Sequence, residues 1–419
     1  MTITRAAACL TFMLPAYASA RMSVTKMTCD GQQGMAVTDG SATVRWQLSS
    51  DVNDDRQTAW QVRVAEALGG GTVYDSGTVT DCVNYAATLP TLRHVPGGYT
   101  WQVRVWDSDG EPSEWSAEQP IRVVPALTGV QWIGAISRED ARIPEGSWSN
   151  EQFNKDGFSA AWADVDTLSR RSVMLRREFA TDSGRVVADA AAMTGNAGDR
   201  DKYALLAEET TEAFNRAFYH PDSCSYGSGS QASNAIPLYM GIVEEKNRAA
   251  VTASLTDDIA AHGNRLTTGD VGNRYLFRTL ADNGRNDLLY SMLNHYETPG
   301  YGYQLTSGAT TLTEQWDSRK GSSWNHFMMG QIDEWLFRSL AGIQQQEGSC
   351  GMRHLLIRPW LPDDMEYVKA STASLYGNIG VHCTRHSLTV SIPVGCDALI
   401  VTPDGNTTPV GSGVHSLAF

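Results

Sequence analysis

Hydrophobic and polar residues alternate along the N-terminal part of the chain. The stretch "GYTWQVRVWDSDG" places Tyr99, Trp101, Val103 and Val105 at every second position, with Gln102 and Arg104 between them. A period of two is the pattern of a half-buried β-strand. "ATVRWQLSS" and "AWQVRVAEA" repeat the pattern, and turn clusters such as "LGGG" and "VPGG" separate the runs. Residues 22–124 are therefore predicted to form a small antiparallel β-sandwich with its tryptophans in the core.

The period becomes helical in residues 181–343. In "DRDKYALLAEETTEAFNRAFYHP", an apolar stripe recurs at three- and four-residue intervals until Pro221 ends it. The same pattern predicts further helices near residues 185–194, 234–243, 245–261, 272–282, 285–295 and 324–342. Glycine-rich loops such as "TPGYGYQLTSGATT" join them. Paired helices with such loops at one end indicate a toroid of α-hairpins.

Two further regions read as β structure. "VQWIGA" and "SRRSVMLRREFA" in residues 125–180 look like strands, but two strands cannot close a sandwich, so this region is predicted to be the remnant of a second β domain. Residues 350–419 contain "HLLIRPWLP", "VKASTASLYGNIGVHC", "SLTVSIPVG" and "DALIVTPDG", which read as short strands bounded by glycine and proline. They predict a C-terminal β-sandwich.

The charge of the chain excludes some partners. A formal charge of -14 and a pI near 5.1 argue against nucleic acid and against an anionic membrane surface, because both require a basic face. The chain has no HExxH or CxxC motif, its nine histidines are scattered, and no phosphate-binding glycine loop occurs. We therefore expect no metal and no cofactor. Oligomeric state, calcium dependence and the pairing of the seven cysteines stay open.

The first 20 residues have the composition of a secretory signal. One arginine is followed by an apolar stretch and by Ala18-Ser19-Ala20, a small-residue cleavage site. This predicts a secreted or periplasmic protein; the alternative is an apolar N-terminus on a cytoplasmic one. No other segment reaches the ~18 apolar residues of a membrane span.

Candidate chemistry gathers in one stretch, "TTLTEQWDSRKGSSWNHF". Glu314 is placed beside Trp316 in a threonine-rich loop between two predicted helices. Trp316 and Tyr303 offer apolar faces to a sugar ring, while Asn325 and His326 open the helix predicted over 324–342. A glycosidase needs two carboxyl groups across a cleft, of which Glu314 would be one. The competing interpretation makes Glu314 a capping or ion-pairing carboxylate and His326 an ordinary helix-start histidine.

The helix predicted over 324–342 is assigned a cap and a buried face. Its N-cap is predicted at Ser322 or Ser323. Its buried stripe is predicted to comprise Met328, Ile332, Trp335, Leu336 and Ile343. His326 falls off this stripe in the first turn, which would leave its ring available to donate a hydrogen bond into a pocket.

The same segments carry a family resemblance. "GATTLTEQWD", followed by "SSWNHFMMGQIDEWLFRSLAGI", resembles the end of the catalytic barrel of bacterial-type α-L-rhamnosidases, glycoside hydrolase family 78. "SYGSGSQASNAIPLYMGIV", "HGNRLTTGDVGNRYLFRTLADNG" and "IRPWLPDDMEYVKASTASLYGNIGV" resemble that family too. "GGYTWQVRVWDSDGEPSEWS" is similar to its fibronectin III-like leading domain. The resemblance spans nearly the whole chain in the family's order.

The resemblance implies a fold and an activity. The expected fold is a multidomain one, with a fibronectin-like β-sandwich, an (α/α)6 barrel and a C-terminal β-sandwich. The expected activity is inverting hydrolysis of terminal α-L-rhamnosides, so the expected partner is a rhamnosylated glycoside or oligosaccharide. Glu314 matches the family's general base, His326 matches a sugar-contacting histidine, and Trp316 flanks the base. Aglycone and linkage preference are not implied.

The chain departs from the family at its second catalytic group. The family's general acid lies in a motif of the type D-E-R-x-G-W-x-G-D, and the chain contains no such motif. "LRREFA" at 175–180 resembles the family's β-sandwich region, whereas "TDSGRVVADAAAM" resembles a helix well inside the barrel. Residues 181–343 therefore correspond to the C-terminal half of the barrel. A deletion in the gene and an error in the gene model both account for the join.

Three functions follow from these observations. The first is a rhamnosidase impaired by the missing acid, since general acid catalysis contributes about 10²–10⁴-fold. The second is a non-catalytic carbohydrate-binding protein. The third is a lyase on the same scaffold that cleaves rhamnosyl-uronate linkages.

Overall fold

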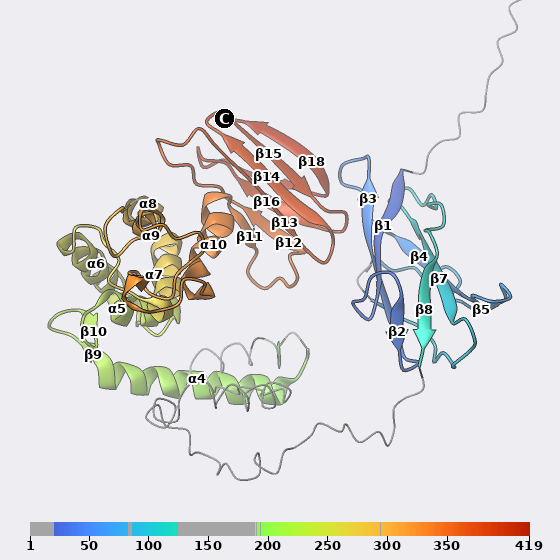
Figure 1. Ribbon diagram of the computed structural model, residues 1–419, viewed down its shortest axis with the longest axis horizontal. Helices are drawn as coiled ribbons and strands as arrows, with labels where there is room; N and C mark the ends of the chain where they lie inside the picture. The colour runs from blue at the N-terminus through green and yellow to red at the C-terminus, as the bar shows by residue number, and fades with distance from the viewer. Residues whose placement is uncertain (1–20, 83–85, 125–188, 190, 193, 294) are drawn as a thin grey trace, which may run out of the picture. The chain divides into compact units, whose positions relative to one another are not determined.

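A computed structural model describes residues 21–82, 86–124, 189, 191–192, 194–293 and 295–419. The described chain contains an N-terminal β domain, a helical segment and a C-terminal β domain (Figure 1). The expectations for residues 1–20 and 125–180 lie outside the described residues, as does most of the helix predicted over 185–194. Among the described helices, none combines the length and the apolar character needed to cross a bilayer.

The N-terminal β domain consists of two sheets around one hydrophobic core. The strands are β1 (Met22–Cys29), β2 (Ala36–Thr38), β3 (Thr43–Ser50), β4 (Ala59–Glu66), β5 (Thr72–Asp75), β6 (Ala87–Thr88), β7 (Tyr99–Trp106) and β8 (Gln119–Val123). One sheet has the order β1-β3-β6 and the other β2-β8-β7-β4-β5. Trp46 of β3 and Trp101 of β7 are buried in the same core.

The alternation in residues 99–105 is confirmed. Tyr99, Trp101, Val103 and Val105 are buried, while the side chains between them are not. Removing apolar surface from water is the main favourable term in folding, so a strand that buries every second residue is fixed in register by that pattern. β7 pairs with β4 over its full length, from Tyr99 opposite Glu66 to Trp106 opposite Ala59.

The helical segment contains α4 (Ala197–Phe218), α5 (Gln231–Tyr239), α6 (Glu245–Ala261), α7 (Asp270–Asp282), α8 (Asn286–Leu293), α9 (Tyr301–Thr306) and α10 (Ile332–Trp335). Helix α7 packs against α5, α8 and α10. Short turns η2 (Ser318–Lys320), η3 (Phe327–Gln331) and η4 (Leu336–Leu340) accompany them. The bounds predicted for α6, α7 and α8 hold to within two residues. Helix α4 ends at Phe218, three residues before Pro221, as predicted.

Two helical predictions are wrong. Residues 324–342 do not form one helix but a succession of 3₁₀ (η3), α (α10) and π (η4) geometry. In consequence, Asn325 and His326 precede the helical turns, Leu336 is exposed, and Ile343 lies in a strand. The loop expected at "YGYQLT" is instead α9, whose Gly302 is buried where a Cβ would lie 2.6 Å from the carbonyl oxygen of His295.

An ion-pair network joins α7 to α10 and η4. Glu334 accepts hydrogen bonds from Arg274 at 2.9 Å and Arg278 at 2.5 Å, and Arg338 pairs with Asp282 at 2.7 Å. Burial alone would raise the pKa of Glu334, but the two arginines outweigh it and the net effect lowers that pKa. The carboxylate is therefore charged and tightly held in the folded chain.

The C-terminal β domain consists of two four-stranded sheets. Its strands are β11 (Ile343–Gln345), β12 (His354–Ile357), β13 (Tyr367–Ala373), β14 (Asn378–Thr384), β15 (Ser387–Ile392), β16 (Asp397–Val401), β17 (Thr407–Val410) and β18 (Gly413–Ala418). The orders are β11-β12-β16-β17 and β13-β14-β15-β18. The predicted runs correspond to β12 to β16, whereas β11, β17 and β18 were not predicted.

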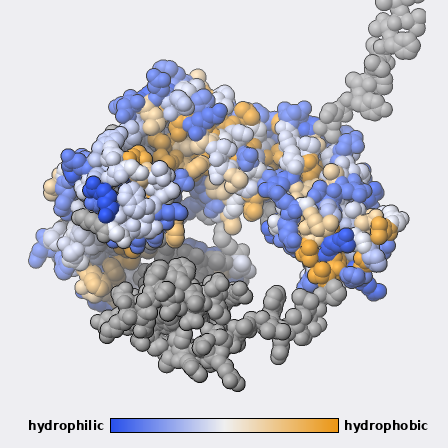
Figure 2. All heavy atoms as spheres, viewed as in Figure 1, coloured by the Kyte–Doolittle hydropathy of each residue, from blue (hydrophilic) through white to orange (hydrophobic). Residues whose placement is uncertain are grey.

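Most residues on the face shown in Figure 2 are hydrophilic or intermediate, and hydrophobic ones gather in smaller groups. The helical segment nevertheless exposes some large apolar side chains, including Phe327 at 82% and Leu305 at 70%.

The cysteines that the structure describes are unpaired, and burial raises the pKa of Cys29 and of Cys396 to about 12. Such thiols stay protonated and unreactive at neutral pH.

The network around Glu334 yields a stability prediction. Replacing Glu334 by Gln leaves Arg274 and Arg278 without their shared carboxylate, and the Glu334 side chain is 30% exposed, so solvent screens part of the loss. We expect a loss of about 1–2 kcal/mol, seen as a fall of a few degrees in the melting temperature of the helical segment by calorimetry.

The neighbouring change Asp333→Asn is the matched control, because Asp333 is exposed and forms no ion pair among the described residues. The folded-state pKa of Glu334 is lowered, so its stabilisation is present above the ordinary value of 4.5 and is lost as pH falls through the folded value. The difference in melting temperature between the parent and Glu334→Gln should therefore become smaller below pH 4.5. A difference in melting temperature that stays constant down to acidic pH would contradict this prediction.

Candidate active site

Four of the five predicted site residues lie on one loop, residues 307–326, between α9 and η3, and the fifth, Tyr303, lies in α9. Two stretches of the loop run side by side and exchange backbone hydrogen bonds. The N–H of Glu314 donates to the carbonyl of Ser323 at 2.9 Å, and the N–H of His326 donates to the carbonyl of Leu312 at 2.9 Å. The hydroxyl of Thr311 donates to the carbonyl of Trp324. This pairing places Glu314 close to Ser323, nine residues along the chain.

The Glu314 carboxylate is held by the same pairing. Its Oε2 accepts a hydrogen bond from the N–H of Ser323 at 2.8 Å, and the side chain is half-buried. Its Oε1 accepts no hydrogen bond from the described residues, and none of the ion pairs among them includes Glu314. A carboxylate with one oxygen fixed by a backbone amide and the other available can accept a proton in a defined direction.

Trp316 anchors the loop to the helical segment. Its indole N–H donates to the carbonyl of Thr268 at 2.8 Å, just before α7. Its ring meets the ring of Tyr301 edge-on, with centroids 5.1 Å apart and planes at 89°. Tyr301 in turn donates its hydroxyl to the carbonyl of Met329 at 2.7 Å, and burial raises the pKa of that phenol. Trp316 thus fixes the position of the loop that carries Glu314.

Tyr303 contacts the ion pair between Arg319 and Asp317. The pattern of apolar residues did not predict this contact. The guanidinium of Arg319 lies 5.2 Å from the centre of the Tyr303 ring and donates to its hydroxyl. Arg319 also donates to Asp317 at 2.8 Å, and chiefly this bond lowers the pKa of Asp317 to about 2. The Tyr303 ring is thus covered by a cation on one face. The only advance signal was the D-x-R spacing in "WDSR".

Asn325 and His326 lie at the end of the loop. Asn325 is exposed, and its N–H donates to the hydroxyl of Ser323 at 3.2 Å. The imidazole of His326 stacks on the ring of Phe327, with planes 4° apart and centroids 5.4 Å apart. The backbone pairing therefore places Asn325 and His326 on the stretch of the loop opposite Glu314. Tyr303 is linked to Asp317 through Arg319.

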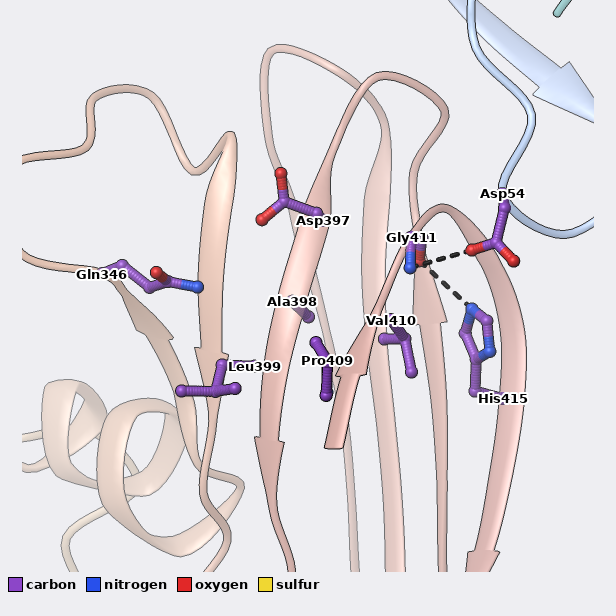
Figure 3. Close-up of a pocket in the computed structure, with 9 residues that line it drawn as sticks. All are labelled: Asp54, Gln346, Asp397, Ala398, Leu399, Pro409, Val410, Gly411 and His415. Carbon is purple, nitrogen blue, oxygen red and sulfur yellow. Dashed lines mark hydrogen bonds between the residues drawn. The ribbon is translucent and has the colours of Figure 1, made fainter. Parts of the chain in front are cut away.

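A separate cavity lies elsewhere in the described chain. It measures about 600 Å³ and is lined by residues of the C-terminal β domain together with Asp54 (Figure 3). Asp54 and His415 both bond to Gly411 there, and Asp397 pairs with His354 at 2.7 Å. No aromatic ring other than the imidazole of His415 lines this cavity, so it lacks the flat carbon face on which sugars stack. It shares no residue with the Glu314 loop.

Three family models match the chain in succession. Residues 24–123 match an N-terminal immunoglobulin domain of the Rha78A type, residues 139–340 a bacterial α-L-rhamnosidase six-hairpin glycosidase domain, and residues 342–416 a bacterial α-L-rhamnosidase C-terminal domain. Together the three models describe the order immunoglobulin-like domain, helical glycosidase domain and C-terminal domain. The boundaries of the two described β domains coincide with the first and third matches to within a few residues, and the described helices lie within the second.

Similar proteins carry the same name. A relative from Streptomyces avermitilis called α-L-rhamnosidase is 29% identical over 261 residues, which cover 59% of this chain and 25% of the relative. A solved α-L-rhamnosidase from Dictyoglumus thermophilum aligns with a TM-score of 0.75 at 13% identity, over 94% of this chain and 99% of that one. The Streptomyces avermitilis enzyme solved with L-rhamnose aligns with a TM-score of 0.53 at 19% identity, over 95% of this chain and 54% of that one.

The two structural likenesses concern the fold alone, because their sequence identity is low. The matched part spans about a quarter of the length of the curated relatives. The three domain matches and the sequence relatives nevertheless point to the same family. On this evidence the chain belongs to the bacterial α-L-rhamnosidase family.

Proposed function

We propose that this chain carries the general-base half of an inverting α-L-rhamnosidase site, with Glu314 as the base. The observation that carries the proposal is the state of its carboxylate. Oε2 is fixed by the Ser323 amide at 2.8 Å, and Oε1 has no hydrogen-bond donor among the described residues. A water bound at Oε1 would lose its proton to the carboxylate as it attacks the anomeric carbon of a terminal rhamnoside.

The other residues of the loop have supporting roles in this proposal. Trp316 sets the position of the base through its bond to Thr268. His326 and Asn325, across the loop from Glu314, donate hydrogen bonds to sugar hydroxyls. Tyr303 acts through Arg319, whose guanidinium it holds at the rim of the loop. The substrate class is a rhamnosylated glycoside or oligosaccharide, which is neutral around the scissile bond and needs no basic surface.

The helices from α5 to α10 are proposed to be the C-terminal half of an (α/α)6 barrel, between two β-sandwich domains. The exposed side chains of Leu305 and Phe327 support this view. Both flank the Glu314 loop, and in a complete toroid further helices would cover apolar surface of this kind.

The proposed activity is impaired in this chain because a proton donor is missing. The sequence contains no acidic motif of the type that supplies the general acid in this family. Without an acid, the leaving group must depart as an oxyanion, and the rate falls by about 10²–10⁴-fold for a glycoside with a poor leaving group. Loss of positioning by half of the pocket adds to this deficit.

A non-catalytic carbohydrate-binding role is the second candidate. The bond between Glu314 and the Ser323 amide favours it, because a carboxylate that satisfies a backbone donor also has a purely structural use. This role predicts L-rhamnose binding in calorimetry, no turnover, and no effect of Glu314→Gln. Those three results together would replace the hydrolase proposal.

Glu314→Gln should abolish turnover of an activated substrate. With 2,4-dinitrophenyl α-L-rhamnoside, the leaving group departs without protonation, so the reaction depends on the base and not on the missing acid. We expect the parent chain to release dinitrophenol slowly, and Glu314→Gln to lower that rate by about 10²-fold or more. Absorbance of released dinitrophenolate measures both.

Glu347→Gln is the matched control, because Glu347 is exposed and has no hydrogen bond or ion pair among the described residues. It should keep the parent rate. Equal rates for Glu314→Gln, Glu347→Gln and the parent would rule out Glu314 as the base.

The stereochemistry of the first product is a separate prediction. A base that activates water on the face opposite the leaving group inverts the anomeric carbon. Proton NMR recorded at early times should therefore show β-L-rhamnose before mutarotation. Initial formation of the α anomer would contradict a water-activating role for Glu314.

A further inference from the structure

A second cavity lies where the helical segment meets the C-terminal β domain. It measures about 360 Å³, within the range of about 300–1,000 Å³ that ligand pockets occupy. Its wall is formed by the end of α7, the start of α8, η4, β11 and the segment after β12. The lining residues used below are Asp282, Asn286, Arg338, Gln344, Arg358 and Trp360.

Backbone bonds make the walls of this cavity rigid. The N–H of Trp360 donates to the carbonyls of Ser339 at 3.1 Å and Leu340 at 3.2 Å, and the N–H of Arg358 donates to Gly342 at 2.9 Å. Gly342 has φ +77°, and a Cβ there would lie 2.2 Å from the carbonyl carbon of Arg358. Only glycine allows the two segments to approach so closely.

Aromatic packing orients Trp360. Tyr290 meets the Trp360 ring at 65° with centroids 6.0 Å apart, and Trp335 meets it at 58° with centroids 6.3 Å apart. The indole N–H of Trp360 has no hydrogen-bond acceptor within the part of the chain that the structure describes. The cavity therefore has an aromatic wall of fixed orientation, and the indole N–H of Trp360 is available to a ligand.

The charges of the cavity do not cancel. Arg338 is neutralised by Asp282 at 2.7 Å. Arg358 is exposed and has no ion pair with any described carboxylate. The cavity thus carries one uncompensated positive charge in a chain whose formal charge is -14. A ligand that completes it would bring one negative charge.

Two amide side chains add neutral hydrogen-bonding groups. The Oδ1 of Asn286 accepts the indole N–H of Trp335 at 2.9 Å, which leaves its amide group to other partners. Gln344 is only 8% exposed, and its Nε2 donates to the carbonyl of Arg338 at 3.0 Å. The Oε1 of Gln344 accepts no hydrogen bond from the described residues, which leaves it available to a ligand.

We propose that this cavity binds a uronic acid residue of a saccharide. The carboxylate of the sugar pairs with Arg358, for which the planar guanidinium is suited. The hydroxyls bond to Asn286 and Gln344, and the C–H face of the ring packs on Trp360. The larger cavity of Figure 3 suits such a ligand less well, because Asp54 and Asp397 line it and repel an anion.

This site uses none of the residues of the Glu314 loop and goes beyond the proposed hydrolase function. A chain that holds an acidic saccharide here would be retained on a polymer that contains uronic acids. The proposal concerns binding alone, so it can be tested without measuring turnover.

The test is calorimetric titration of the full chain with D-galacturonate and, as the neutral counterpart, D-galactose. We expect D-galacturonate to bind at least tenfold more tightly than D-galactose. Arg358→Gln should weaken D-galacturonate binding about tenfold or more, as loss of a charge-assisted bond predicts. Arg93→Gln is the matched control, because Arg93 is exposed and its guanidinium has no partner among the described residues.

Three results would overturn the proposal. One is equal binding of D-galacturonate by Arg358→Gln and Arg93→Gln, with melting temperatures that show both variants to be folded. Another is competition by inorganic phosphate at the same concentration as D-galacturonate, which would indicate a site for any anion. The last is loss of binding in Glu314→Gln, which would place the sugar in the other site. If Glu314 proves not to be the base, D-galacturonate should still bind to this cavity, so the failure of one proposal is distinguishable from the failure of the other.

Discussion

The pairing between the two halves of the 307–326 loop is the constraint on which the site depends. It consists of the hydrogen bonds between Glu314 and Ser323 and between His326 and Leu312. The bond from Trp316 to Thr268 then attaches the paired loop to the helical segment. A carboxylate on an unsupported loop of this length would sample many positions, and general base catalysis depends on placement within hydrogen-bond reach of the proton. Hydrogen bonds of the backbone, rather than a buried core, hold this loop in place.

Under the proposed function, the chemistry of the chain is one-sided for the same structural reason. The proposed base lies on a loop that is complete within the described residues, with its anchor, its paired stretch and its Asp317–Arg319 pair. The sequence contains no acidic motif of the type expected for the general acid. The proposed site therefore separates two contributions that normally act together, activation of water and protonation of the leaving group. It also exposes apolar side chains near the loop, which a missing half-barrel would explain.

Local patterns predicted part of this structure. The alternation in residues 99–105 is a property of one strand, so it could be interpreted without knowledge of its partners. The helix expected over 324–342 failed because the N–H groups of Asn325 and His326 bond to Ser323 and Leu312, which removes them from a helical turn. The bond between His326 and Leu312 joins residues more than ten positions apart, and periodicity does not detect it. Gly302 marked a close backbone approach within α9 rather than a flexible loop.

The dependence of the rate on the leaving group tests most directly whether the chain lacks a proton donor. A series of aryl α-L-rhamnosides whose phenols differ in pKa would report how much protonation assists departure. With Glu314 present and no acid, turnover by the intact chain should fall steeply as the phenol pKa rises, with the dinitrophenyl compound fastest. A rate that is nearly independent of phenol pKa would mean that a proton donor acts in this chain, and would contradict the account.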